Sequence, residues 1–172
     1  MRDKPPAKFL EALGWLTVRW SGLESLIEMS CAYLFQAGLV QTKDGRPPKP
    51  FGTRIKFIRR NLRHPAFAHL REEYEAALQS AERLSKERND KTHGIYTTWS
   101  SVSAHTQVVI KSHDKGYVAI QDIMVSESDL SDLSERIGAA FAAHFNLMDR
   151  MKSTLRALNG DNELGRRMIF GD

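Results

Sequence analysis

The sequence predicts a mainly α-helical protein, an up-and-down bundle of about four helices with a small antiparallel β-sheet inserted before the last helix. Three observations support this fold class. Several long stretches repeat apolar residues at steps of three and four, the period of an amphipathic helix. One stretch, from about residue 95 to 123, is instead rich in Thr, Val, Ile, Tyr and Trp, the composition of β-strands. The length of 172 residues suits one compact domain.

We therefore expect a single helical domain over residues 1–172, with its core at about residues 5–158 and a loose tail at 159–172. The charged fraction of 27% and the hydrophobic fraction of 41% are ordinary for globular proteins and exclude a disordered chain or a fibre. The single cysteine, Cys31, can form no internal disulfide, and no apolar run is long enough to cross a membrane. The charged, proline-rich start at residues 1–6 does not resemble a secretory signal. These features predict a cytoplasmic protein without a membrane partner.

The first helix is expected to run from Pro5 to about Gln36. Proline suits a first helical turn, where no amide donor is needed, and Gly38 is well placed to end the helix. The apolar face consists of Phe9, Leu13, Leu16, Trp20, Leu23, Ile27 and Leu34, with Ser30 in the one remaining place. An exposed loop at residues 38–50 should follow, because its Asp-Gly pair and three prolines cannot continue a helix.

A second, short helix is expected from Phe51 to Leu62. One of its sides is apolar and consists of Phe51, Ile55, Ile58 and Leu62. The remaining positions carry the basic residues Arg54, Arg59, Arg60 and Arg63. The outer face of this helix should therefore be basic.

A third, long helix is expected from about Ala66 to His93, where Gly94 supplies a C-terminal stop. Its apolar face consists of Phe67, Leu70, Tyr74, Ala77, Ala81 and Leu84. The next place on that face is occupied by Arg88, which breaks the pattern. The predicted β insert then occupies about residues 95–123, with a turn at 113–116.

The final helix is expected from about Glu127 to Leu158, capped by Ser126 or Ser128. Its apolar face consists of Leu133, Ile137, Phe141, His144, Met148, Met151, Leu155 and Leu158. A histidine on such a face is more often a hydrogen-bonded core residue than a ligand, so we expect the former for His144.

Basic residues concentrate in one segment of the chain. Residues 43–63 contain eight Lys and Arg against a single acid, Asp44, which gives the segment a formal charge of +7 and leaves −3 for the remaining chain. A local block of this kind favours a polyanion such as nucleic acid, and the alternative is an ordinary solvated surface.

Several familiar catalytic sites are missing from the sequence. It contains no P-loop, no dinucleotide fingerprint, no His-Glu-x-x-His pair and no Gly-x-Ser-x-Gly elbow. His64 and His69 lie five residues apart, and His105 and His113 flank a predicted strand, but neither pair has a third ligand at a useful spacing. We therefore expect neither a metal site nor a cofactor.

The residues that point to chemistry lie at the end of the third helix. Arg88 occupies a place that calls for an apolar residue, and because burying an unpaired guanidinium is costly it should face an anion, a polar partner or a second subunit. Asn89 and His93 are four residues apart and share a helix face. Arg88 and His93 are five apart, about 140° around an ideal helix. The structural alternative is an arginine paired with a carboxylate and a histidine that completes the helix terminus.

Arg88, Asn89 and His93 thus follow a simple pattern. An arginine is followed directly by a polar residue, and a histidine stands five places after the arginine. This pattern resembles the signature of the HEPN superfamily (higher eukaryotes and prokaryotes nucleotide-binding domains). In that family the motif lies toward the end of a long helix in a bundle of four to five helices, often before a glycine, as in this sequence. The opening helix, with Trp20 to Glu24, is also similar to bacterial members. The resemblance covers about residues 5–158, and the β insert departs from the minimal bundle.

The resemblance implies a metal-independent RNA endonuclease that acts as a homodimer, with the motifs of two chains facing each other. Arg88 would hold the scissile phosphate, His93 would move a proton at the ribose 2′-hydroxyl or the leaving oxygen, and Asn89 would orient His93 or touch the phosphate. Attack by the 2′-hydroxyl would leave a 2′,3′-cyclic phosphate. The predicted RNA-binding residues are Arg54, Lys56, Arg59, Arg60 and Arg63.

Two alternatives stand beside the enzyme. The superfamily also contains non-catalytic binding and scaffolding domains, so Arg88 and His93 could instead serve the interface of a dimeric helical module. The other alternative is a protein that binds nucleic acid through the basic segment and does not cleave it. The resemblance is compatible with a toxin or phage-defence role, for which an antitoxin protein is a candidate partner.

Overall fold

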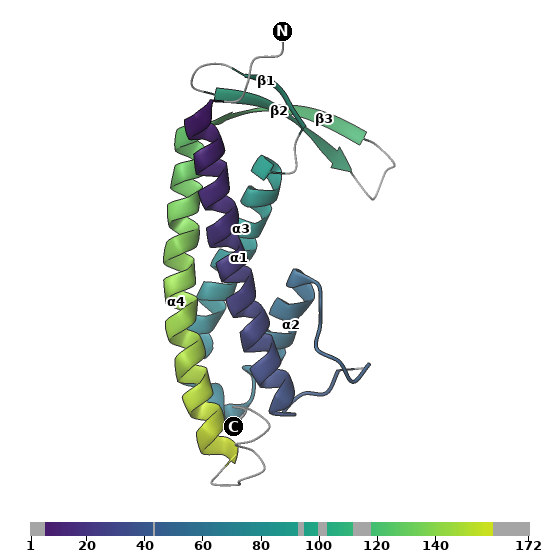
Figure 1. The fold of residues 1–172 in the computed structure, drawn as a ribbon. Helices are drawn as coiled ribbons and strands as arrows, with labels where there is room; N and C mark the ends of the chain where they lie inside the picture. Colours follow the sequence, from purple (N-terminus) through teal and green to yellow (C-terminus); the bar gives the residue numbers. More distant parts are fainter. Residues whose placement is uncertain (1–5, 43, 93–94, 100–102, 112–117, 160–172) are drawn as a thin grey trace. The chain divides into compact units, whose positions relative to one another are not determined.

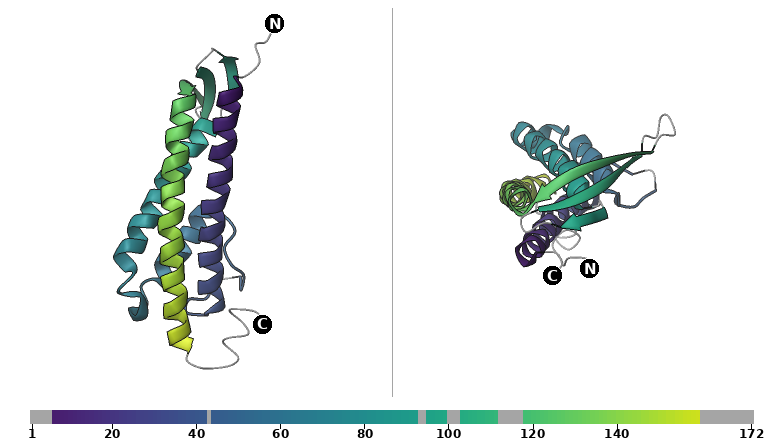
Figure 2. Two further views of the ribbon diagram at one scale, coloured as in Figure 1. Left: turned by 60° about the vertical axis from the view of Figure 1, so that its left-hand side comes forward. Right: turned by 90° about the horizontal axis from the view of Figure 1, so that it is seen from above.

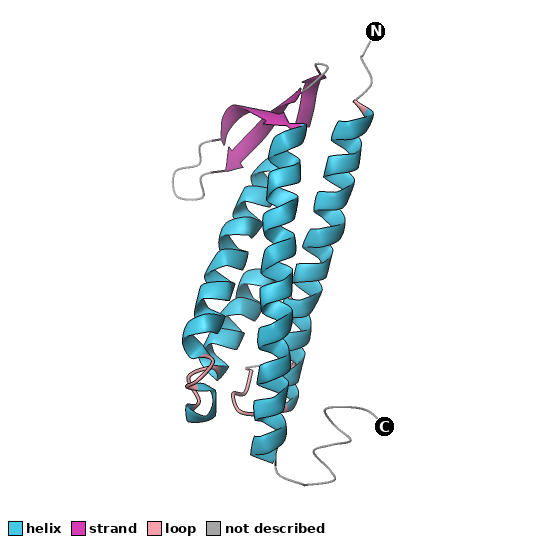
Figure 3. Cartoon of the chain, turned by 90° about the vertical axis from the view of Figure 1, so that its left-hand side faces the viewer, coloured by secondary structure: helices cyan, strands magenta, loops and turns pink. Residues whose placement is uncertain are grey.

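The computed structural model describes residues 6–42, 44–92, 95–99, 103–111 and 118–159, with side chains described outside residues 93–123. The elements in chain order are α1 (Ala7–Gln36), α2 (Phe51–Asn61), the short 3₁₀ helix η1 (Pro65–Phe67), α3 (Arg71–Thr92), β1 (Ile95–Trp99), β2 (Ser103–Lys111), β3 (Val118–Ser126) and α4 (Glu127–Asn159) (Figure 1). Helices make up most of the described chain (Figure 3), which confirms the mainly helical fold class. The predicted turn at 113–116 and the tail beyond Asn159 lie outside the described residues.

The chain forms two compact units. Unit 1 consists of Met1–Trp20 and Arg83–Gly138, and unit 2 of Ser21–Glu82 and Ala139–Asp172. Helices α1, α3 and α4 each contribute one segment to both units, whereas α2 belongs to unit 2 and the strands belong to unit 1.

Helix α1 agrees closely with its prediction. It begins at Ala7 and ends at Gln36, and Gly38 beyond it has a φ of +68°, the left-handed conformation that glycine adopts without strain. The buried positions on its predicted apolar face are Phe9, Leu16, Trp20, Leu23, Ile27, Ser30 and Leu34. Neither α1 nor any other helix in the described part of the chain is long and apolar enough to cross a membrane.

The start of the third helix differs from its prediction. The sequence pattern placed it at about Ala66, but the chain first forms η1 and begins α3 only at Arg71. His64 caps this 3₁₀ turn, since its Nδ1 accepts a hydrogen bond of 3.3 Å from the Ala66 amide. The amide of Phe67 then bonds the carbonyl of His64 three residues back, which tightens the backbone into a 3₁₀ turn.

One position on the buried face of α3 differs from its prediction. Leu78 is fully buried, whereas the predicted Ala77 is only half-buried. In α2, Phe57 is buried in addition to Ile55 and Ile58. Larger side chains therefore fill the core at both helices.

Helix α4 is capped as predicted, by Ser126. The Ser126 hydroxyl accepts a hydrogen bond of 3.1 Å from the Asp129 amide, and the Asp129 carboxylate accepts one of 2.8 Å from the Ser126 amide. Two predicted core residues of this helix are wrong, because Phe141 and Leu158 are 37% and 40% exposed. The buried residues of α4 are Leu130, Leu133, Ser134, Ile137, His144, Leu147, Met148, Met151 and Leu155.

Along the chain, three strands follow α3 and precede α4. They pair side by side in the order β1-β2-β3 (Figure 2). Both pairings are antiparallel. Strands β2 and β3 pair without interruption from Ser103 opposite Ser126 to Lys111 opposite Val118. The pairing of β1 with β2 contains a register shift between Tyr96 and Thr98.

A polar cluster lies inside the core of unit 2. The Ser30 hydroxyl lies 3.3 Å from the Tyr74 hydroxyl and 3.4 Å from Nε2 of His144, and the two rings meet edge to face at 5.3 Å. His144 is only 1% exposed, and this burial lowers the pKa of its imidazole to about 4. The prediction that His144 is a hydrogen-bonded core residue is confirmed.

Candidate functional site

The last turns of α3 carry the predicted catalytic residues Arg88 and Asn89. The Arg88 guanidinium lies over the ring of Trp20 in α1, with Cζ 5.7 Å from the ring centroid, and its Nη1 donates a hydrogen bond of 2.9 Å to Oδ1 of Asn89. Both contacts lie within unit 1. The structure therefore brings Arg88 and Asn89 together, whereas His93 and the glycine after it lie outside the described residues.

The position of Arg88 agrees with one of the expectations from the sequence. A half-buried arginine on an otherwise apolar face meets a polar partner, Asn89, and the face of an indole. Cation–π stacking of this kind lets a guanidinium occupy a largely apolar surrounding. Asn89 thus accepts a hydrogen bond from Arg88, while its predicted contact with His93 or the phosphate stays a prediction because His93 lies outside the described residues.

Neighbouring residues tie this end of α3 to the start of α4. Glu87 accepts hydrogen bonds of 2.6 and 3.0 Å from the two terminal nitrogens of Arg136, and these bonds lower the pKa of the Glu87 carboxyl. Lys91 lies 3.7 Å from the carboxylate of Asp129, which caps α4. Two ion pairs thus flank Arg88 along the helix and fix its backbone position within unit 1.

Two of the five predicted RNA-binding residues are engaged in ion pairs inside unit 2. Arg59 donates to both carboxylate oxygens of Glu75, at 2.9 and 3.1 Å, and to both oxygens of Glu82, at 2.8 and 3.0 Å. These bonds raise the pKa of the Arg59 guanidinium above its usual range. Arg54 lies 3.1 Å from the carboxylate of Glu28 and donates to the carbonyl of Pro48. Both side chains therefore hold the fold together.

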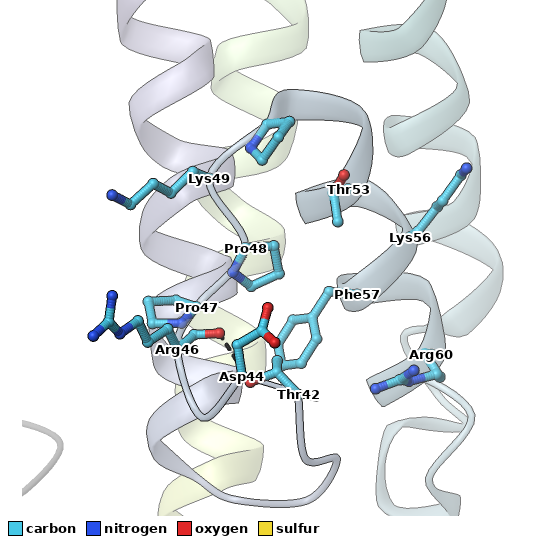
Figure 4. Close-up of a pocket in the computed structure, with 11 residues that line it drawn as sticks. Thr42, Asp44, Arg46, Pro47, Pro48, Lys49, Thr53, Lys56, Phe57 and Arg60 are labelled. Carbon is cyan, nitrogen blue, oxygen red and sulfur yellow. Dashed lines mark hydrogen bonds between the residues drawn. The ribbon is translucent and has the colours of Figure 1, made fainter.

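The other three predicted residues are exposed, and two of them line a pocket. This pocket, which we call the basic pocket, has a volume of about 850 Å³ and lies between α2 and the loop before it (Figure 4). It is lined by Thr42, Asp44, Arg46, Pro47, Pro48, Lys49, Pro50, Thr53, Lys56, Phe57 and Arg60. Lys56 and Arg60 come from the predicted set, whereas Arg63 is exposed outside the pocket lining.

Sequence reasoning did not select Arg46 and Lys49 as binding residues. Both belong to the basic segment, so the charge count contained a signal, but the path of a proline-rich loop does not follow from composition. In the structure this loop brings the two side chains to one side of Phe57 and Pro48, while Lys56 and Arg60 lie on the other side (Figure 4).

Hydrogen bonds hold the loop of the basic pocket in place. The Thr42 hydroxyl donates to the carbonyl of Arg46 at 2.9 Å, and Gly45 between them adopts a φ of +60°. Arg60 donates to the carbonyl of Gln41 at 2.8 Å, which ties the loop to α2. These bonds hold the loop that lines the basic pocket against α2.

Within the described residues, no three His, Cys, Asp or Glu side chains come together as a set of metal ligands. No family model, no curated protein sequence and no solved structure matches this chain.

Proposed function

We propose that this protein is a cytoplasmic, metal-independent RNA endonuclease that resembles the HEPN superfamily and acts as a homodimer. The observation that carries the proposal is the fixed guanidinium of Arg88, held by the Trp20 ring and by Asn89 in the last turns of α3. A cation positioned before substrate binds needs no reorganisation when negative charge grows on a phosphate in the transition state. His93 follows five residues later at the end of the same segment.

The proposed chemistry uses two side chains. Arg88 binds the scissile phosphate and stabilises the charge that develops on its oxygens. His93 accepts the proton of the ribose 2′-hydroxyl or supplies one to the leaving 5′-oxygen, a task that suits an imidazole near neutral pH. The 2′-oxygen attacks phosphorus, the bond to the 5′-oxygen breaks, and the product ends in a 2′,3′-cyclic phosphate.

The exposed surface of α1 supports self-association. Trp15 and Val18 in unit 1 are 57% and 62% exposed, and helical geometry places both of them roughly opposite the buried Trp20. Helix α1 therefore has an apolar side chain pair on its outer face as well as an apolar inner face. Exposed apolar surface of this kind is typical of interfaces, and a two-fold dimer is the commonest solution.

Cleavage of RNA by the purified protein in the presence of a chelator tests the proposal. Arg88→Ala and His93→Ala should each lower the rate by roughly a hundredfold or more, because one electrostatic or acid–base contribution is typically of that size. Arg83→Ala, an exposed arginine one and a half turns earlier on α3, is the control and should cleave normally. Chelator-sensitive cleavage, or equal rates in all four proteins, would contradict the mechanism.

A subunit-mixing experiment tests the composite site. If each site takes Arg88 from one chain and His93 from the other, mixing the two inactive variants should restore about a quarter of the wild-type rate, since half of the dimers are mixed and each contains one intact site. Mixtures as inactive as the separate variants would show that each site forms within one chain.

The basic pocket favours a second candidate function, a non-catalytic RNA-binding module. Its lining residues lie in unit 2, and its binding capacity needs neither Arg88 nor His93. RNA that binds with high affinity but stays intact under all conditions would favour this alternative over the enzyme.

A further inference from the structure

Six of the eight cations of the basic segment fall into two groups with different tasks; of the other two, Arg63 is exposed outside the pocket lining and Lys43 lies outside the described residues. Arg54 and Arg59 are half-buried and paired with carboxylates of unit 2. The other group is exposed and lines the basic pocket, and it consists of Arg46, Lys49, Lys56 and Arg60. With one lining carboxylate, Asp44, the basic pocket has a formal charge of +3. Only the second group presents uncompensated charge at a concave surface, which is where an anion is bound.

We infer that the basic pocket binds an unpaired segment of RNA, with phosphates on the four lining cations and a base against the apolar wall of Pro47, Pro48 and Phe57. The inference rests on the proposed function, because it assigns the site where the RNA substrate of that activity is held. It also assigns a role to Arg46 and Lys49, which the sequence pattern did not separate from the rest of the basic segment.

The shape of the basic pocket selects single-stranded over double-stranded RNA. Phe57 is 5% exposed and lies beside Pro48 in the middle of the pocket, with cations on both sides (Figure 4). A base can reach this apolar centre only if it is not stacked inside a duplex, whereas the flanking phosphates can reach the cations at the rim. A concave site with an apolar floor and a charged rim is the arrangement that single-stranded nucleic acids require.

The rigidity of the loop strengthens the inference. The bonds from Arg60 to Gln41 and from Arg54 to Pro48 tie the loop to α2, and the bond from Thr42 to Arg46 closes a turn within the loop. A guanidinium has five N–H donors, so Arg60 can keep its bond to the loop and still donate to a phosphate. Little conformational entropy is lost on binding at such a site.

Fluorescence anisotropy with the full chain and a labelled twelve-nucleotide RNA carrying 2′-O-methyl groups tests the inference. This RNA binds but cannot be cleaved through its 2′-oxygen, so affinity is measured independently of catalysis. Lys56→Ala and Arg60→Ala should each weaken binding by about threefold to tenfold and lower the slope of log affinity against log salt by about 0.7, the value for one phosphate contact on a single strand.

Two further variants make the test specific. Arg63→Ala removes the same charge from an exposed arginine that lies only three residues after Arg60 but outside the pocket lining. The affinity of this variant for the RNA should stay within about twofold of wild type. Asp44→Asn removes the one lining carboxylate and should strengthen binding. The same sequence annealed to its complement should bind at least several times more weakly.

Each result decides one question. Equal losses for Arg60→Ala and Arg63→Ala, equal affinity for the duplex, or no gain for Asp44→Asn would overturn the inference, even if the protein cleaves RNA. Selective losses at Lys56 and Arg60 in a protein that never cleaves RNA would uphold the pocket and refute the proposed enzyme.

Discussion

Acidification should destabilise the fold through the buried imidazole of His144. The folded state holds this group neutral with a pKa of about 4, while the unfolded chain binds a proton near its ordinary value of 6.5. The unfolded state therefore binds more protons as the pH falls through this window, and stability is lost. Linkage gives a loss of about 2 kcal/mol between pH 7.5 and pH 5, and about 3 kcal/mol once the pH is below both values.

Urea denaturation at pH 7.5 and pH 5 measures this loss. With a denaturant slope of about 2 kcal/mol per molar, the midpoint should fall by about 1 M. His144→Gln keeps a group that can bond the Ser30 hydroxyl but cannot titrate, so its midpoint should depend much less on pH. Carboxyls with lowered pKa also lose stabilisation in acid, and these are Glu73, Glu75, Glu87 and Asp129. Both proteins share these carboxyls, so an equal pH dependence in the two would refute the role assigned to His144.

Two other predictions concern stability. Arg59→Ala should lower the free energy of unfolding by about 1 kcal/mol, because it leaves two carboxylates of α3 without their shared partner. Arg63→Ala should change the free energy of unfolding little. Urea denaturation of both variants measures the difference. Gly38→Ala should destabilise by about 1 kcal/mol, since its φ of +68° disfavours a side chain, while Gly14→Ala, inside α1 with open space around it, should stabilise by up to about 1 kcal/mol. Thermal unfolding should show opposite shifts for the two glycines, and shifts of the same sign would contradict the argument.

The helix positions could be predicted because the signals for them are local. Helix α1 ends before Gly38 and α4 begins after Ser126, since a left-handed glycine and a capping hydroxyl act on their own neighbours in sequence. The start of α3 was mispredicted although His64 and Pro65 are equally local. The apolar period continues through residues 66–70, and it does not distinguish an α-helix from a 3₁₀ turn in which Phe67 is also buried.

Burial on α4 was predicted less well than its length. Phe141 fits the period of three and four, yet 37% of it is exposed; one edge of its ring lies near Gly22 of α1, and the ring stacks with that of Phe145, which is itself half exposed. A glycine on the neighbouring helix leaves room for a ring to lie across the surface. The period of one helix contains no information about which residue a partner helix presents.

Tertiary contacts also explain why the charges of the basic segment could be counted from the sequence, although their individual roles could not be predicted from it. Glu75 and Glu82 lie seven residues apart on one face of α3, and Arg59 of α2 spans both. The glutamate pair is visible in the sequence, but which arginine of α2 faces it is set by helix packing, and the environment of Lys56 and Arg60 depends on the loop. Composition gave the charge of the segment, and tertiary contacts decided which cations face solvent.

Arg88 joins the structural and the chemical arguments. An arginine on an apolar face creates a packing problem, and the ring of Trp20 offers the guanidinium a cation–π contact, with Cζ 5.7 Å from the ring centroid. A cation–π contact leaves the N–H groups of a guanidinium able to donate hydrogen bonds, and Nη1 of Arg88 donates one to Asn89. The contact that makes Arg88 tolerable in the bundle thus also orients its donors, and that orientation is what phosphate binding requires. Trp20→Leu should destabilise the fold, because Trp20 is a buried core residue, and should also lower RNA cleavage per folded dimer, with a rise in the concentration of RNA needed for half-maximal rate. A role of the indole in folding alone would leave the rate per folded dimer unchanged.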